Sequence, residues 1–179
     1  MDNDKKKYGV YFANLAEYNN GNMIGDWLYP LEYKTFEDFV TAIKKVTKNA
    51  DEIAVHDYDN FVDMGEYPSH ESIYNLAHAL VESSLKDEII IKYFNDFYSN
   101  DYEDLIDEIK NIEDNFINEY DSFKEYADEF ADEEICCQIP KEARQFVFNN
   151  FDYDGYARTL EYDYHVIDLD NYKVAIFHT

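Results

Sequence analysis

The chain has 179 residues, of which 40 are Asp or Glu and 15 are Lys or Arg, giving a formal net charge of −25. This balance excludes direct binding to nucleic acid or to an anionic membrane surface, since both would repel the chain. Hydrophobic residues make up 46% and aromatic residues 18% of the sequence, so the chain can bury a core, unlike a disordered acidic tail.

Residues 1–65 are predicted to form a small sheet with one helix. Strands are expected over residues 8–15 and 53–58, and a second strand is expected to begin within residues 27–29. Asn20-Gly21 and Gly25 indicate turns. Thr35 is expected to cap the helix. The helix repeats apolar residues on one face: Phe36, Phe39, Val40, Ile43 and Val46.

Residues 66–114 are predicted to form a helical middle domain. Ser69 is expected to cap a helix whose buried residues are Ile73, Leu76, Ala77 and Leu80. Residues 86–98 leave two structures open, because Ile89–Ile91 suggests a strand whereas the wider apolar spacing suggests a helix. Asn100 is expected to cap a further helix, whose apolar face comprises Leu105, Ile106, Ile109 and Ile112.

Residues 115–179 are predicted to form a third, mixed α/β domain. A short strand over residues 116–120 precedes a helix that Ser122 caps. The inward residues of this helix are expected to be Phe123, Tyr126, Ala127 and Phe130. Pro140 opens a short helix, and residues 162–169 and 172–177 are expected to form a closing hairpin. The fold class predicted for the chain is therefore α+β, with three small domains over residues 1–65, 66–114 and 115–179.

A short pattern recurs before three of these helices. Tyr33, Tyr67 and Tyr120 each stand two residues before the expected Ser or Thr cap. One interpretation is an aromatic contact that fixes the entry of the chain into the helix. The other is internal duplication, which the irregular spacing of the three copies does not favour.

The negative charge is concentrated in one part of the chain. Residues 95–134 contain 16 acids and 2 bases, and so carry more than half of the net charge. In the helix after Ser122, the residues Glu125, Asp128, Glu129 and Asp132 fall at i, i+3, i+4 and i+7, which places them in one stripe. Like charges at this spacing cost about 0.2–0.5 kcal/mol per pair, so the arrangement calls for a functional reason.

Rows of fixed carboxylates resemble the phosphate backbone of DNA. Duplex DNA carries one charge per roughly 1.7 Å, so 25 net charges correspond to about 43 Å of duplex. We therefore expect an acidic surface that occupies the basic cleft of a DNA-binding protein. Its candidate residues are Asp57, Asp59, Asp63, Glu66, Asp101, Glu103, Asp104, Asp107, Glu108, Glu113, Asp114, Asp121, Glu125, Asp128, Glu129, Asp132, Glu133 and Glu134.

An aromatic cluster near the C-terminal end leaves two interpretations open. Phe146, Phe148, Phe151 and Tyr153 crowd one short stretch. They either belong to the core, which we favour slightly, or form a two-fold dimer interface.

Other motifs give weaker signals. Residues 150–161 fit a calcium-loop pattern apart from Asn150 at its first position, and the alternative is an acidic turn followed by a short helix. For His56-Asp57 we expect a structural role, and for the adjacent Cys136 and Cys137 two idle thiols. Nothing in the sequence favours catalysis, a cofactor or a bound metal. With no apolar run of about 18 residues and no secretory signal, we expect a cytoplasmic protein.

Several segments together resemble one known family. Residues 10–27 (VYFANLAEYNNGNMIGDW) resemble the opening of ArdA-type antirestriction proteins. Residues 53–58 (IAVHDY), 65–69 (GEYPS), 139–140 (IP) and 151–160 (FDYDGYARTL) are similar to further segments of that family, in the same order. Gly155 and Thr159 depart from the residues usual in the family, and residues 133–138 match its antirestriction segment loosely.

This resemblance implies a fold and a function. It implies three small domains in a curved, elongated molecule, and it favours a helix over residues 86–98. It also implies a homodimer that mimics bent B-form DNA and binds the methyltransferase and specificity subunits of type I restriction–modification enzymes. Proteins of this type travel on plasmids, conjugative transposons and other mobile elements, where they protect incoming DNA.

Overall fold

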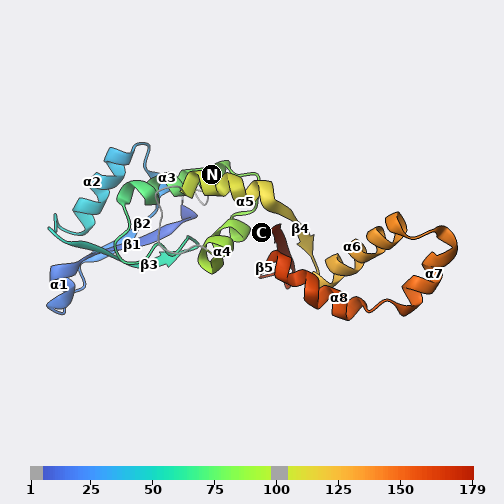
Figure 1. Ribbon diagram of the computed structural model, residues 1–179. Coiled ribbons are helices and arrows are strands. Elements are labelled where there is room, and N and C mark those ends of the chain that lie inside the picture. The colour runs from blue at the N-terminus through green and yellow to red at the C-terminus, as the bar shows by residue number, and fades with distance from the viewer. Residues whose placement is uncertain (1–5, 98–104) are drawn as a thin grey trace. The chain divides into compact units, whose positions relative to one another are not determined.

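The computed structural model describes residues 6–97 and 105–179 and divides the chain into two compact units. The first unit spans Met1–Glu113 and the second Asp114–Thr179. Each unit contains an antiparallel sheet together with helices (Figure 1), which confirms the α+β class. The division into three domains, with a first boundary at residue 65, stays a prediction.

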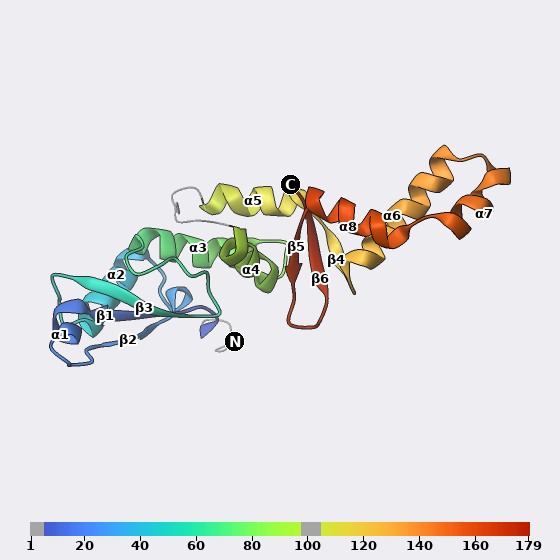
Figure 2. The same cartoon turned by 60° about the horizontal axis from the view of Figure 1, so that its bottom comes forward.

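The first unit is built on a sheet with strand order β2-β1-β3. Its strands are β1 (Gly9–Asn14), β2 (Gly25–Leu28) and β3 (Ile53–Asp59). The short helix α1 (Leu15–Asn19) follows β1, and the 3-10 turn η2 (Pro30–Glu32) follows β2. The helices α2 (Phe36–Val46) and α3 (His70–Glu82) lie on one side of the sheet (Figure 2), where Phe12 meets Phe39 edge-on with ring centroids 5.8 Å apart.

Two further helices complete this unit. Residues 86–98 were open between strand and helix, and the helix α4 (Asp87–Phe97) confirms what the family resemblance implied. In α5 (Leu105–Asn115), Ile109 and Ile112 are buried as predicted. The prediction was wrong for Ile106, which is 46% exposed. The expected cap at Asn100 lies outside the described residues.

The second unit has a sheet with strand order β4-β6-β5. Its strands are β4 (Phe116–Tyr120), β5 (Tyr164–Asp168) and β6 (Val174–His178), and its helices are α6 (Phe123–Gln138), α7 (Lys141–Asn150) and α8 (Tyr153–Leu160). The core comprises Phe123, Tyr126, Ala127, Ala157 and Ile176. The predicted hairpin is present, but β5 begins at Tyr164 because residues 161–163 form the 3-10 turn η3 (Glu161–Asp163). In the described part of the chain, no helix has the length and apolar character needed to cross a membrane.

Three of the predicted helix caps are confirmed. Thr35, Ser69 and Ser122 each accept a hydrogen bond from the backbone N–H three residues later, at 3.1, 3.4 and 3.1 Å. Tyr33 and Tyr120 pack on the aromatic residue at the fourth position of their helices, with ring centroids 5.5 and 5.2 Å apart. These two contacts support the helix-entry interpretation of the recurring tyrosine.

One predicted turn was wrong. Gly21 does adopt a positive φ of 82°, as a turn requires. Gly25, however, is the first residue of β2 and pairs with Ala13 across the sheet. A side chain at Gly25 would overlap the backbone carbonyl of Phe12, so close approach between strands explains the glycine there.

A buried polar pair joins β1 to the end of α2. The Asn14 side chain is 8% exposed and donates a hydrogen bond to the carbonyl of Thr47 at 3.0 Å. The same side chain accepts a hydrogen bond from the N–H of Glu17 at 3.1 Å, which caps α1. One amide therefore satisfies two backbone groups on different elements.

We expect Asn14→Ala to lower the free energy of unfolding by about 1–3 kcal/mol, because a buried carbonyl loses its donor and α1 loses its cap. Asn14→Ser keeps a capping oxygen and is expected to lose about half as much. Urea unfolding followed by circular dichroism measures both changes. Asn75→Ala, at an exposed site of α3, is the matched control. Equal stabilities for the two Asn14 variants would show that the cap of α1 contributes nothing.

Candidate functional site

The helix α6 presents the clearest acidic surface. Tyr126 and Ala127 lie three and four residues after Phe123, so the three side chains share one side of the helix. This side packs into the core of the second unit. The opposite side carries exposed carboxylates from Glu125, Glu129 and Asp132. Glu133 and Glu134 are exposed nearer the end of the helix, where Glu134 falls in line with Ala127 of the core side. The fourth member of the predicted stripe, Asp128, is only half-exposed.

Several of these carboxylates are held by neutral donors. Asp132 accepts a hydrogen bond from the hydroxyl of Tyr153 on α8 at 2.5 Å, and this bond raises the pKa of Tyr153 to about 12. Glu125 accepts one from the backbone N–H of Asp121 at 2.9 Å. Both carboxylates keep their full charge and lose freedom of position.

Lysines pair with some of the predicted acids in the described part of the chain. Lys124 lies 2.7 Å from Asp128 and 3.3 Å from Asp154, and hydrogen bonding to Asp128 is the main cause of the raised pKa of its ammonium. Lys173 lies 3.1 Å from Asp121. The third such pair joins Lys110 and Asp107, at 3.6 Å. Residues 114–179 nevertheless contain 16 acids against 5 bases, so the second unit stays strongly negative.

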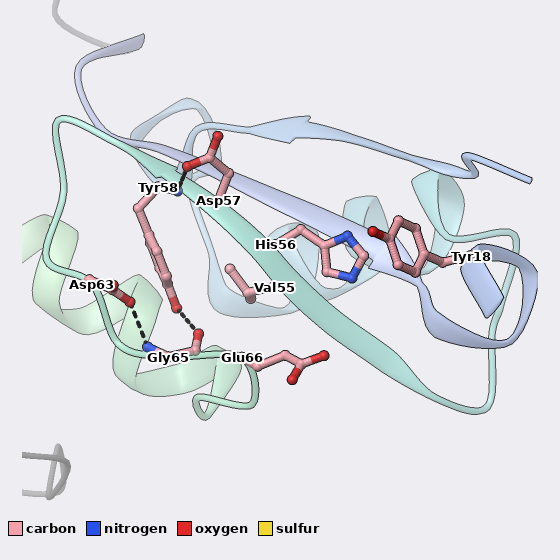
Figure 3. Close-up of a pocket in the computed structure, with 8 residues that line it drawn as sticks. All are labelled: Tyr18, Val55, His56, Asp57, Tyr58, Asp63, Gly65 and Glu66. Carbon is pink, nitrogen blue, oxygen red and sulfur yellow. Dashed lines mark hydrogen bonds between the residues drawn. The ribbon is translucent and has the colours of Figure 1, made fainter. Parts of the chain in front are cut away.

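One group of predicted acids in the first unit lies at the end of β3 and in the loop after it. Asp57, Asp59, Asp63 and Glu66 are all exposed. The loop is fixed to the strand, since the carbonyl of Glu66 accepts a hydrogen bond from the N–H of Val55 at 2.9 Å. Figure 3 shows the side chains of three of these acids, all but Asp59, around one pocket.

The acids of α5 differ from one another. Asp107 and Asp114 are exposed, whereas Glu108 and Glu113 are half-buried. Glu113 accepts hydrogen bonds from the hydroxyls of Ser83 and Ser84, at 2.5 and 3.0 Å, and from the N–H of Ser84 at 2.7 Å. Its carboxylate therefore joins α5 to the end of α3. Asp101, Glu103 and Asp104 lie outside the described residues.

The aromatic cluster divides between the two interpretations. Phe146 on α7 is 73% exposed, so the slightly favoured core assignment was wrong for this residue. Phe148, Phe151 and Tyr153 are half-buried. Phe151 packs against Tyr153 with ring centroids 4.9 Å apart. The cluster thus has one end packed against α8 and one end exposed on α7.

The residues that fit the calcium-loop pattern form the start of helix α8. Asp152 accepts a hydrogen bond from the N–H of Gly155 at 2.9 Å and caps α8. Gly155 lies inside this helix, whereas a calcium loop needs the glycine for a sharp turn. Among the described residues, no three His, Cys, Asp or Glu side chains are grouped to hold a metal.

Sequence reasoning missed one feature, a pocket of 520 Å³ beside β3. Tyr18 and His56 line it with their rings 4.4 Å apart, together with Asp57, Asp63 and Glu66. The pocket could not be found from spacing alone, because Tyr18 and His56 are far apart in the sequence. Their proximity depends on the pairing of β1 with β3.

Exposed carboxylates on both units, carried on α+β scaffolds, define this chain as an acidic α+β protein. The model of one family, described as Antirestriction protein (ArdA), matches residues 10–172. The chain therefore belongs to the ArdA antirestriction family. No curated protein matches the chain.

The bonded state of Glu113 generates a pH-dependent prediction. Hydrogen bonding from Ser83 holds the pKa of Glu113 below its ordinary value. A carboxyl with a lowered folded pKa stabilises the protein fully above its unfolded pKa, about 4.3, and this stability is lost as the pH falls through the folded value. Glu113→Gln is therefore expected to cost about 1 kcal/mol at neutral pH, a figure reduced by solvent screening.

The difference from wild type is expected to shrink as the pH falls through the lowered folded pKa of Glu113, because the native carboxyl is then also neutralised. Urea unfolding at a series of pH values measures it. Asp114→Asn removes the same charge at the adjacent exposed position and serves as the control. A cost for Glu113→Gln that is constant with pH would contradict a bonded carboxylate.

Proposed function

We propose that this protein inhibits type I restriction–modification enzymes by presenting its carboxylates in place of DNA phosphates. It competes with DNA for the recognition core of the enzyme, formed by the methyltransferase and specificity subunits. The inhibition is by binding and not by catalysis, and we place it in the cytoplasm, where these enzymes act. Membership of the antirestriction family supports the target. The acidic face of α6 is the observation that carries the proposal.

The charge density of α6 is comparable with that of DNA. Between Glu125 and Glu134 the helix rises about 14 Å at about 1.5 Å per residue. Over this length it carries the acids Glu125, Asp128, Glu129, Asp132, Glu133 and Glu134. Duplex DNA of the same length carries about eight phosphates. Because Lys124 pairs with Asp128, five of these acids are left, and a cationic cleft would meet more than half the density of charge that DNA presents.

Association would be driven by the release of bound ions. A cleft lined with Lys and Arg concentrates anions, and an acidic face concentrates cations, so their contact frees both sets. Each exposed charge contributes a small amount, and no single carboxylate is essential. An acidic inhibitor of another basic DNA-binding protein would use the same physics, and the choice between targets is an outcome of the experiment below.

The test is a competition assay in which a purified type I methyltransferase core is bound to labelled DNA and titrated with this protein. We expect displacement that weakens steeply between about 50 and 200 mM salt. Glu129→Gln and Glu133→Gln are expected to weaken displacement less than about fivefold each, with their effects multiplying in the double variant. Failure of the wild-type protein to displace DNA at low salt would contradict the proposed target.

Glu32→Gln/Glu37→Gln is the matched control for the double variant. It removes the same charge from exposed positions of a segment, residues 1–50, whose net charge is zero. If the control weakened displacement as much as the α6 double variant, total charge and not the acidic face would be responsible.

We further propose a homodimer that contacts through α7. No residue of α7 is fully buried, and Phe146 is 73% exposed. Arg144 donates hydrogen bonds to the carbonyls of Ile139 and Cys136, at 2.8 and 2.5 Å, and so holds α7 against the end of α6. A fixed helix with an exposed aromatic ring suits a self-complementary contact between two copies.

Phe146→Glu is therefore expected to give a folded monomer, because a charge replaces the apolar centre of the interface. Sedimentation velocity measures the oligomeric state and circular dichroism the fold. Tyr162→Glu places the same charge at an 88% exposed ring of the same unit and is expected to remain dimeric. A Phe146→Glu variant that stays dimeric would exclude α7 as the interface.

A further inference from the structure

The first sheet carries a row of aromatic rings that includes Tyr11. Its neighbour Phe12 meets Phe39 of the covering helix α2, and successive residues of a strand face opposite sides of the sheet, so the row lies on the other side. Trp27 meets Tyr11 edge-on with ring centroids 5.6 Å apart, and Tyr11 stacks on His56 at 6.5 Å. Tyr18, from α1, then meets His56 edge-on at 4.4 Å. We call these four residues the aromatic row. It ends at the pocket beside β3.

An irregularity of the sheet places His56 in this row. Tyr11 pairs with Asp57, but the next residue of β1, Phe12, pairs with Val55. His56 is therefore an extra residue in β3, and the register shifts at this point as in a β-bulge. Bulges turn side chains away from regular alternation. Here both His56 and Asp57 accompany Tyr11, so an aromatic ring and a carboxylate lie side by side.

The pocket at the end of the row combines rings with negative charge. Figure 3 shows the ring of His56 beside that of Tyr18, with Glu66 on the neighbouring loop. The lining residues include Asp57, Asp63 and Glu66 and contain no Lys or Arg. The loop is tied to β3, since the carbonyl of Gly65 accepts a hydrogen bond from the Tyr58 hydroxyl at 2.7 Å.

We infer that this pocket binds the side chain of an arginine from the DNA-binding cleft of the target enzyme. The inference rests on the proposed function, which it deepens by naming a specific contact on the first unit. The guanidinium stacks against Tyr18 and His56 and donates hydrogen bonds to the carboxylates at the rim. DNA-binding clefts carry arginines that contact phosphates, and such arginines lose their partner when DNA is displaced.

The chemistry of the pocket selects arginine over other cations. A guanidinium is planar, is weakly hydrated and donates through a fork, so it can stack on a ring and bind a carboxylate at once. An ammonium keeps its hydration shell and gains less from an aromatic wall. The pocket volume of 520 Å³ exceeds what a single metal ion needs.

Trp27 allows binding at the aromatic row to be followed by its fluorescence, because it is the only tryptophan of the chain and meets Tyr11, which stacks on His56 of the pocket. Labelled hexa-arginine and hexa-lysine peptides would be titrated into the full chain, with anisotropy measuring affinity and tryptophan emission following the aromatic row. We expect hexa-arginine to bind about two- to fivefold more tightly than hexa-lysine and to change the emission more strongly. Equal affinities and equal emission changes would overturn the inference.

Three variants separate the aromatic contact from general charge. Tyr18→Leu removes the ring and is expected to abolish the preference for arginine, whereas Tyr18→Phe keeps it. Tyr172→Leu, at a 95% exposed tyrosine of the second unit, is the matched control and is expected to keep the preference. Tyr18 is 51% exposed on a helix with no buried residue, so these substitutions leave the core intact.

The same variants in the DNA-competition assay distinguish the two proposals. If the wild-type chain displaces DNA and Tyr18→Leu is weaker by about two- to fivefold, both proposals are supported. If both proteins displace DNA equally and the peptides show no preference, the arginine pocket is excluded while the inhibitory function stands. If the wild-type chain displaces no DNA, the proposed function fails, and the peptide titration alone decides whether the pocket binds arginine.

Discussion

Repulsion between carboxylates is the constraint that the structure must overcome. A pair of like charges one helical turn apart costs about 0.2–0.5 kcal/mol, and α6 contains several such pairs. Full burial of one large apolar side chain contributes about 1.5–3 kcal/mol. Phe123 and Tyr126, on the opposite side of the helix, are both nearly buried. One or two rings in the core therefore offset the repulsion of a whole acidic face, which explains an acidic chain that is also rich in aromatic residues.

Tyrosine hydroxyls can also hold a carboxylate in position without neutralising its charge. A lysine partner fixes the group but neutralises it, as Lys124 does for Asp128. A neutral hydroxyl or backbone N–H fixes it and leaves the charge, as Tyr153 does for Asp132. The phosphates of DNA are positioned by covalent bonds, and these neutral donors replace that restraint in the protein. With 18 tyrosines, the chain has more tyrosine hydroxyls than its 15 lysines and arginines.

Features fixed by neighbouring residues could be predicted from the sequence, and features fixed by strand pairing could not. The caps at Thr35 and Ser122 depend on a side chain and an N–H three residues away, so their sequence pattern is sufficient. Gly25 looked like a turn because nothing local indicates its close approach to another strand. Glu113 looked like a surface charge, although Ser83 and Ser84 of a different segment bind it.

Added salt has opposite effects on the stability of the fold and on the proposed binding. A high net charge destabilises the compact state through self-repulsion, and added ions screen that repulsion. The same ions weaken binding to a cationic cleft, because fewer are released on contact. Salt therefore strengthens the fold while it weakens the proposed interaction. Loss of inhibition at raised salt would consequently report on the interface and not on unfolding, since the same ions reduce the self-repulsion that opposes folding.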